Sequence, residues 1–200
     1  VDAASYIPDD LKKELLAKHS LVMHSLRLPQ INSIFFNQEK NKFLGDIKIR
    51  QALAFAIDRD YLFNEVLGES ASRADGPIIS PDFSYTPDGS FYNLDKDKAE
   101  QLLDESGFKR VDVSQDMIDN PEHSPELSAI IAYASSTQIA ATGYWRVALK
   151  DKEYQVLALK LSVPENGRMD VAESLKKDWE LIGVKTIIVP VALASLNAEI

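Results

Sequence analysis

The sequence predicts an α/β fold with a mixed sheet flanked by helices, and three observations support that prediction. Two amphipathic helix patterns, over 46–58 and 95–106, each begin at an aspartate. Near the C-terminus an alternating apolar run over 156–163, a helical apolar stripe over 167–182 and a second apolar run over 184–189 follow one another. Strand, helix and strand at this spacing indicate a βαβ unit, in which the two strands run parallel.

The N-terminal part is expected to contain one short helix and two strands. Acidic residues at the start of 9–18 suit the first turn of a helix, where the helix dipole favours negative charge. Strands are expected over 20–26 and 31–37. In the second of them Ile34 and Phe36 would share one face, because side chains alternate along a strand.

The helix over 46–58 is the clearest element of the chain. Asp46 can cap its N-terminus. Its apolar side chains recur at helical spacing and are Ile49, Leu53, Ala56 and Ile57. A second helix is expected over 60–67, ending at Gly68, and residues 69–94 are expected to be loop because proline and glycine recur there.

The middle of the chain is expected to contain one helix and then a long irregular stretch. The helix over 95–106 ends at Gly107, which occupies the usual C′ position. Residues 111–126 contain five acids, no Lys or Arg and two prolines, which favours a solvated loop. We therefore expect 109–143 to be a loop-rich insertion, followed by a strand over 144–149.

The predicted βαβ unit has a defined apolar face on its first strand and on its helix. Along the first strand this face consists of Leu157, Leu159, Leu161 and Val163. Along the helix the stripe consists of Val171, Leu175, Trp179 and Ile182. Gly183 ends the helix, and a parallel crossover of this kind is right-handed in about 98% of cases. The sequence therefore predicts a right-handed unit over 156–190.

The composition excludes several classes of protein. The 200 residues carry a formal net charge of −9, which argues against a nucleic-acid partner, because phosphate binding needs clustered Lys and Arg. Cysteine is absent, so disulfides, thiolate metal sites and a cysteine nucleophile are excluded. No apolar stretch approaches the roughly 20 residues that a membrane-spanning helix needs. The chain begins at Val1 rather than Met and ends at Ile200, and we expect both ends to be cuts within a longer protein.

The motifs include no catalytic constellation. The three histidines, His19, His24 and His123, lack the clustered spacing of a metal site, so we expect no metal. Residues 68–72 lack the second glycine and the leading strand of a nucleophile elbow. Neither a P-loop nor a GxGxxG motif occurs. We therefore expect no cofactor, no catalytic residues and no enzyme activity.

Two features have both a structural and a ligand-binding interpretation. Tyr144 and Trp145 could stack on a ligand, but an aromatic pair at the start of a strand more often belongs to the edge of the core. Arg50 lies beside the apolar stripe of its helix. A structural partner is more common there than a ligand, because a buried charge must be paired.

Three separated stretches resemble the family 5 extracellular solute-binding proteins, which include oligopeptide-, dipeptide- and nickel-binding proteins of ABC importers. Residues 34–37 read Ile-Phe-Phe-Asn, and residues 46–59 read Asp-Ile-Lys-Ile-Arg-Gln-Ala-Leu-Ala-Phe-Ala-Ile-Asp-Arg. They are similar to the family's strand ending in Phe-Asn and to its D-V-R-V-R-Q-A-L-x-x-A-I-D-R helix. This motif is long and specific.

The other two stretches follow in the order and spacing of the family. Residues 92–108 contain Tyr-Asn-Leu-Asp, Lys-Ala-Glu-Gln-Leu-Leu and Ser-Gly-Phe, which resemble Y-D-x-x-K-A-x-x-L-L-x-x-A-G-F. Residues 159–184 resemble the family's L-T-L-x-x-P strand and its helix ending in L-x-x-I-G-V. Residues 1–18 are also similar, so the resemblance covers nearly the whole chain. Residues 41–43 depart from the family's Pro-Pro or Pro-Phe.

The resemblance implies a type II periplasmic-binding-protein architecture, in which two lobes close around a ligand. Residues 1–200 would be a single α/β domain, truncated at both ends, that forms much of the second lobe. The strand over 31–37 would approach the cleft, so we expect Ser33, Phe35 and Asn37 to bind ligand. Asn37 has the alternative interpretation that it holds the following turn. The principal ligand contacts would lie beyond the C-terminal end of this chain.

The resemblance also implies a protein that captures a solute, expected to be an oligopeptide, and delivers it to an ABC permease. It would act as a monomer outside the cytoplasm, in the periplasm or as a cell-surface lipoprotein. One alternative is a receptor of the same fold that senses a solute, and another is a binder of a nickel chelate or other small solute. A linked sensor domain in the full reading frame would favour the receptor.

Overall fold

The computed structural model describes residues 7, 9–18, 21–22, 24, 31–68, 71, 92–120 and 122–199. The chain divides into two compact units, Val1–Asn32 and Ser33–Ile200. In the first unit, helix α1 (Asp9–Leu16) lies where the sequence predicts a short helix. The predicted strand over 20–26 and the predicted loop over 69–94 lie largely outside the described residues. A single domain with cut ends stays a prediction.

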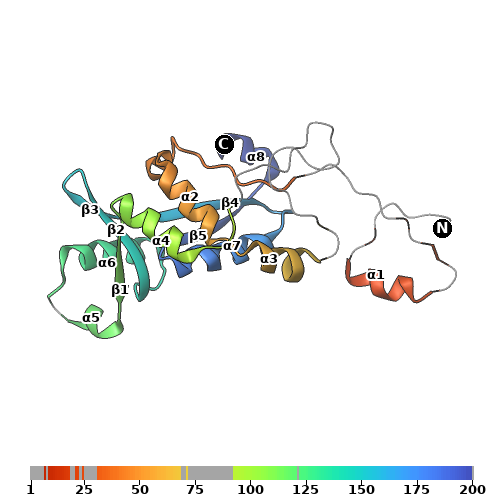
Figure 1. Cartoon of the computed structure of the whole chain (residues 1–200), viewed down its shortest axis with the longest axis horizontal. Coiled ribbons are helices and arrows are strands. Elements are labelled where there is room, and N and C mark those ends of the chain that lie inside the picture. Colours follow the sequence, from red (N-terminus) through yellow and green to blue (C-terminus); the bar gives the residue numbers. More distant parts are fainter. Residues whose placement is uncertain are drawn as a thin grey trace. The chain divides into compact units, whose positions relative to one another are not determined.

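The second unit contains interspersed helices and strands (Figure 1). Its first elements are the 3-10 helix η1 (Lys42–Gly45), α2 (Ile47–Ala56), α3 (Arg59–Tyr61), the π-helix η2 (Leu62–Leu67) and α4 (Lys96–Glu105). The elements that follow are β1 (Lys109–Val113), α5 (Gln115–Asp119), α6 (Pro125–Thr137), β2 (Gly143–Lys150) and β3 (Glu153–Val156). The last are β4 (Ala158–Pro164), α7 (Met169–Leu181), β5 (Lys185–Val191) and α8 (Leu193–Glu199).

The described residues form one antiparallel and one parallel sheet. Strands β1, β2 and β3 pair antiparallel in chain order, and β4 pairs with β5 in parallel. Helix α7 connects the two parallel strands, which confirms the βαβ unit and the α/β class, whereas the described strands form two separate sheets in place of the predicted mixed sheet. The register places Leu159 beside Thr186 and Arg110 beside Arg146. The right-handed crossover stays a prediction.

Strand β2 separates two hydrophobic clusters, because its side chains alternate between the two faces of the sheet. Trp145 and Val147 pack in the smaller cluster with residues of α6, such as Ile130. Ala148 belongs to the larger cluster, which also contains Leu53 of α2. Because Trp145 is fully buried, the structural interpretation of this tryptophan is confirmed.

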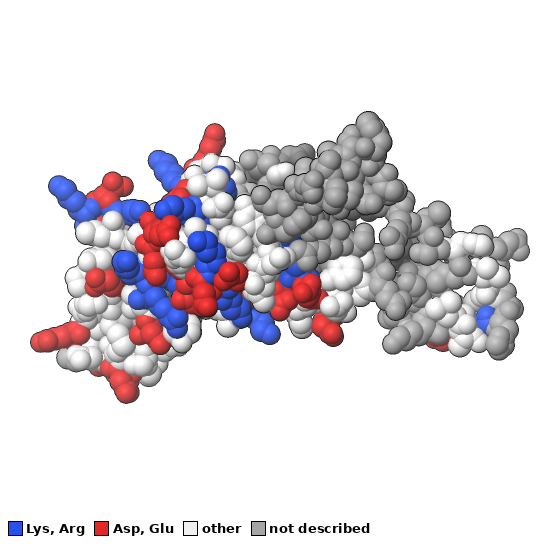
Figure 2. Space-filling model, in the orientation of Figure 1, with Lys and Arg blue, Asp and Glu red and all other residues white. Residues whose placement is uncertain are grey.

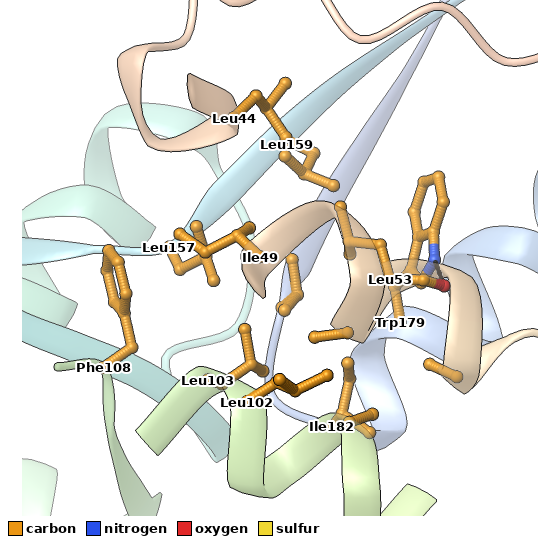
Figure 3. Packing of buried hydrophobic residues seen from close by; sticks show 14 of the residues in the cluster. Leu44, Ile49, Leu53, Leu102, Leu103, Phe108, Leu157, Leu159, Trp179 and Ile182 are labelled. Carbon is orange, nitrogen blue, oxygen red and sulfur yellow. Dashed lines mark hydrogen bonds between the residues drawn. The ribbon is translucent and has the colours of Figure 1, made fainter. Parts of the chain in front are cut away.

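The larger cluster joins α2, α4 and α7 with the start of β4 (Figure 3). Trp179 of α7 is 1% exposed, and its indole Nε1 donates a hydrogen bond to the Leu53 carbonyl oxygen at 3.0 Å. Phe43 packs edge-on against Phe108, with the two ring centroids 5.1 Å apart. The apolar stripes that the sequence predicts for three helices therefore meet in one core.

The ends of the predicted helices agree with the structure. Asp46 caps α2 and Asp95 caps α4, each through a side-chain oxygen that accepts a backbone amide. Gly107 and Gly183 follow α4 and α7 with φ of +87° and +85°, a left-handed conformation that glycine adopts without strain. The helix predicted over 60–67 is present as α3 followed by η2, so most of it is π rather than α.

Two further sequence predictions are wrong. Residues 31–37 form no strand, because no neighbouring strand is paired with this segment in the described part of the chain. The stretch 109–143 is not loop-rich, because β1, α5 and α6 occupy most of it. Ser124 caps α6 by accepting the Leu127 amide at 3.2 Å, and Pro125 fits the first turn. That this stretch is an insertion stays a prediction.

Charges of both signs are interspersed over the face of the second unit that is drawn in Figure 2. One of the ion pairs joins Lys48 of α2 to Glu105 of α4, with the Nζ and Oε2 atoms 3.0 Å apart. Among the described residues, no helix combines the length and the apolar character that crossing a membrane requires.

Candidate functional site

The predicted ligand-binding residues lie in an irregular segment that leads into η1. Ser33 is exposed, and the Phe35 side chain is 72% exposed. Phe36 instead packs against the larger hydrophobic cluster and so fixes the segment to the core. Ile34 is 37% exposed, so the predicted apolar face holds at Phe36 but not at Ile34. Ser33 and Phe35 are therefore accessible, as a ligand contact requires.

Asn37 holds the turn that follows this segment. Its Oδ1 accepts hydrogen bonds from the backbone amides of Glu39 at 3.0 Å and Lys40 at 2.9 Å. Its carbonyl oxygen accepts a bond from the Asn41 amide at 3.2 Å. An asparagine side chain that bonds the backbone two residues on is typical of turns. The Oδ1 atom is thus engaged in the turn, in agreement with the second interpretation of Asn37.

Sequence reasoning missed Asn41, which ties the turn to β4. Its Nδ2 donates to the Ala158 carbonyl oxygen at 3.0 Å, and its Oδ1 accepts the Phe43 amide at 3.2 Å. The second bond caps η1. An asparagine placed before a helical start was the available signal. The turn after the candidate segment is thereby fixed to the parallel sheet.

Arg50 has structural partners, as the sequence analysis favours. Its Nη1 donates to the carbonyl oxygens of Leu44 at 2.6 Å and Gly45 at 3.0 Å. Both carbonyls belong to η1, so Arg50 holds η1 against α2. The guanidinium therefore has a role within the fold, which accounts for its position beside the core.

The accessible groups of residues 31–37 are of kinds that can contact a ligand. Ser33 offers a hydroxyl group and Phe35 an aromatic face, and residues 31–37 include no charged side chain. Within the ranges that the structure describes, no three His, Cys, Asp or Glu residues are placed to hold a metal ion. The His123 Nε2 lies 3.0 Å from a backbone carbonyl oxygen of α5 and His24 is exposed, while His19 lies outside the described residues.

Sequence reasoning also missed two buried charged residues, which lie outside the candidate segment. Arg146 of β2 is 1% exposed and forms ion pairs with Glu100 and Asp104 of α4. Asp178 of α7 is 7% exposed and accepts the Asp58 amide at 2.9 Å. These charges hold elements of the fold together rather than forming part of the candidate site.

Comparison with known proteins identifies the family. The model of the "Bacterial extracellular solute-binding proteins, family 5 Middle" matches residues 1–199. The chain therefore belongs to the family 5 bacterial extracellular solute-binding proteins. This match confirms the resemblance inferred from the sequence motifs.

Two curated relatives show how much of a family member the chain represents. Heme-binding protein A of Haemophilus influenzae is 36% identical over 75 residues, which are 38% of this chain and 14% of that protein. The Dipeptide-binding protein of Escherichia coli is 30% identical over 95 residues, which are 46% of this chain and 18% of that protein. The matched parts are thus less than a fifth of each relative's length.

Solved structures share the fold. NikZ from Campylobacter jejuni in complex with Ni(L-His) has a TM-score of 0.55 and 25% identity, covering 80% of this chain and 26% of that chain. The oligopeptide-binding protein AppA from Bacillus subtilis, in complex with a nonapeptide, has a TM-score of 0.55 and 23% identity over the same shares. The predicted fold class, part of a type II periplasmic-binding-protein lobe, is confirmed.

Proposed function

We propose that this chain is part of the solute-binding component of an ABC importer and that its solute is an oligopeptide. The observation that carries the proposal is the family match over residues 1–199. Similar proteins include one with a bound nonapeptide and one named for dipeptide binding. Because the chain covers 26% and 18% of these two proteins, we infer that a longer protein supplies the rest of the solute site.

Ser33, Phe35 and Asn37 are the contacts that we propose within this chain. The Ser33 hydroxyl can bond a peptide group, and the exposed Phe35 ring can pack on an apolar side chain of the solute. Asn37 ends the same segment and orients it through the following turn. The uncharged character of the segment suits the middle of a peptide rather than its charged ends.

The proposed protein binds its solute without chemical change. The family and the fold are those of binding proteins. We propose that it acts as a monomer with an ABC permease as partner, in the periplasm or as a cell-surface lipoprotein.

A second candidate solute is a small metal chelate or haem. A similar structure holds nickel with histidine, and a relative is named for haem binding. In that case the longer protein would supply the groups that contact the metal or the porphyrin.

Thermal unfolding of the longer protein with oligopeptides, with nickel plus histidine and with haem separates these candidates. A solute that binds the folded state stabilises it by about 2.7 kcal/mol at a hundredfold excess over Kd, which raises the Tm. We expect the Tm to rise with oligopeptides alone. A rise with the chelate or haem alone would support the second candidate. No rise with any of the three would contradict solute binding of these classes.

A further inference from the structure

The corner between α2 and α3 brings together two carboxylates. Asp58 caps α3, because its Oδ1 accepts the Tyr61 amide at 2.9 Å. Asp178 reaches the same corner from α7, and its Oδ2 accepts the Asp58 amide at 2.9 Å. Asp178 therefore holds the residue that itself begins the helical stretch formed by α3 and η2.

This helical stretch is fastened to α7 at both of its ends. Near its start, the Lys177 Nζ lies 5.7 Å from the centroid of the Tyr61 ring. Near its end, Arg168 donates from Nη2 to the Val66 carbonyl oxygen at 2.9 Å. Figure 1 shows α3 next to α7, with which η2 is in contact. Among these contacts, the hydrogen bond from the Asp58 amide has a buried titratable side chain, Asp178, as its acceptor.

The Asp178 carboxyl is buried, and burial disfavours its charged form. The residue is 7% exposed. Burial raises the pKa of its carboxyl above the ordinary value, and the charge of Asp58 adds to the rise. The hydrogen bond from the Asp58 amide, Lys96 of α4 and Lys177 of α7 oppose that rise without cancelling it. Asp178 therefore binds its proton more tightly when α3 and α7 are held together, which we call the closed corner, than when its carboxyl is exposed to water.

The sign of the pH effect follows from this raised pKa. Below the ordinary aspartate pKa of about 3.9, Asp178 is protonated in both states and the closed corner has its full stability. As the pH rises through the raised value, the closed corner must hold a buried charge, and part of that stability is lost. A protonated carboxyl keeps an oxygen that can accept the Asp58 amide.

We propose that Asp58 and Asp178 form a latch between α7 and the α3–η2 stretch, and that acidification tightens this latch. Protonation of Asp178 removes both its repulsion from Asp58 and the cost of burying its charge. The stretch is consequently held more firmly near the ordinary aspartate pKa of about 3.9 than at neutral pH. The latch is a property of this chain and does not depend on the proposed solute.

Amide exchange measured by NMR on the chain tests the latch, because it holds the amides of Asp58 and Tyr61. After correction for intrinsic exchange, the protection of both amides should rise as the pH falls from about 7 towards the ordinary aspartate pKa of about 3.9. The largest rise in protection that Asp178 can produce is about tenfold for each unit by which its pKa is higher in the closed corner. The Lys98 amide is the internal control, because an exposed carboxylate, Asp95, accepts it at 2.8 Å. Its protection should not rise.

Asp178→Asn supplies a variant that is neutral at every pH and keeps the acceptor oxygen. In this variant the protection of the Asp58 and Tyr61 amides should be independent of pH. Asp95→Asn is the matched control and should leave both amides as in the wild type. The proposal is overturned if wild-type protection is flat or falls on acidification, rises equally at Lys98, or keeps its pH dependence in Asp178→Asn. The comparison with Lys98 decides the matter even if the variant does not fold.

Discussion

The Arg146 Nη1 lies 2.8 Å from the Asp104 Oδ1 and joins β2 to the last turn of α4. The same guanidinium donates from Nε to the Ile182 carbonyl oxygen, just beyond α7, at 2.9 Å, and its Nη2 lies 3.2 Å from Glu100. This positive charge thus lies at the C-terminal ends of α4 and α7, where the helix dipoles favour a cation. One buried side chain therefore connects the antiparallel sheet to two helices of the larger core.

Replacing Arg146 by methionine should lower the free energy of unfolding by about 2–4 kcal/mol. Removing one partner of a fully buried ion pair costs about 3–5 kcal/mol, and the loss is smaller here because Asp104 is 49% exposed. Arg110→Ala is the control. Arg110 pairs with the same Glu100 carboxylate at 3.2 Å but is 40% exposed, so its loss should cost about 0–1 kcal/mol. Equal urea midpoints for the two variants would show that Arg146 does not join these elements.

Trp179→Ala should lower the free energy of unfolding by about 3–5 kcal/mol, because it leaves a cavity in the larger cluster. The change also removes the hydrogen bond to the Leu53 carbonyl oxygen that Figure 3 shows. Leu181→Ala on the same helix is the control, since this leucine is 45% exposed and its truncation should cost about 0.5 kcal/mol or less. Denaturant midpoints measure both variants. A loss below about 1 kcal/mol for Trp179→Ala would mean that the predicted stripe does not form the core.

Lys152→Gly should stabilise the hairpin of β2 and β3. Its two-residue turn has φ of +51° at Asp151 and +71° at Lys152, which is typical of a type I′ turn that favours Asn-Gly. A left-handed residue other than glycine costs about 1–2 kcal/mol, and the greater freedom of glycine in the unfolded chain offsets part of the relief. We expect a net gain of up to about 1 kcal/mol by calorimetry. Glu153→Gly, one residue into β3, should instead destabilise, and a matching loss at Lys152→Gly would contradict the turn geometry.

The helix at 46–58 could be predicted from the sequence because its signals are local. Asp46 caps it, and its apolar side chains recur at helical spacing. The strand predicted over 31–37 failed because alternation does not specify a partner strand, and a strand needs one. The turn at Asn37, by contrast, involves backbone amides only two and three residues further along the chain. The turn role of Asn37 could therefore be predicted from the sequence.

Helix α6 carried a local signal that the acidic composition obscured. Ser124 and Pro125 form a helix start, and the buried residues of α6 have helical spacing. The partners of Arg146 could not be predicted, because Asp104 lies 42 positions away in the sequence. Such contacts depend on which elements pack together, and the local pattern does not contain that information.

Phe35 and Phe36 provide a matched pair for the candidate site. In the longer protein, Phe35→Ala should weaken oligopeptide binding by about tenfold, equal to about 1.4 kcal/mol, with little change in stability. Phe36→Ala should lower the Tm, because this ring packs against the larger cluster. Calorimetry gives the affinities and thermal unfolding gives the stabilities. Unchanged affinity in Phe35→Ala would remove this segment from the proposed site.

The most direct measurement is isothermal titration calorimetry of the longer protein and of this chain alone against the same oligopeptides. We expect the longer protein to bind at about micromolar Kd, because two lobes exclude water from both sides of the solute. This chain alone would lose about half of the roughly 8 kcal/mol of that interface and bind near or weaker than about millimolar. Micromolar binding by the chain alone would contradict the two-sided site, and an absence of oligopeptide binding by the longer protein would contradict the proposed function.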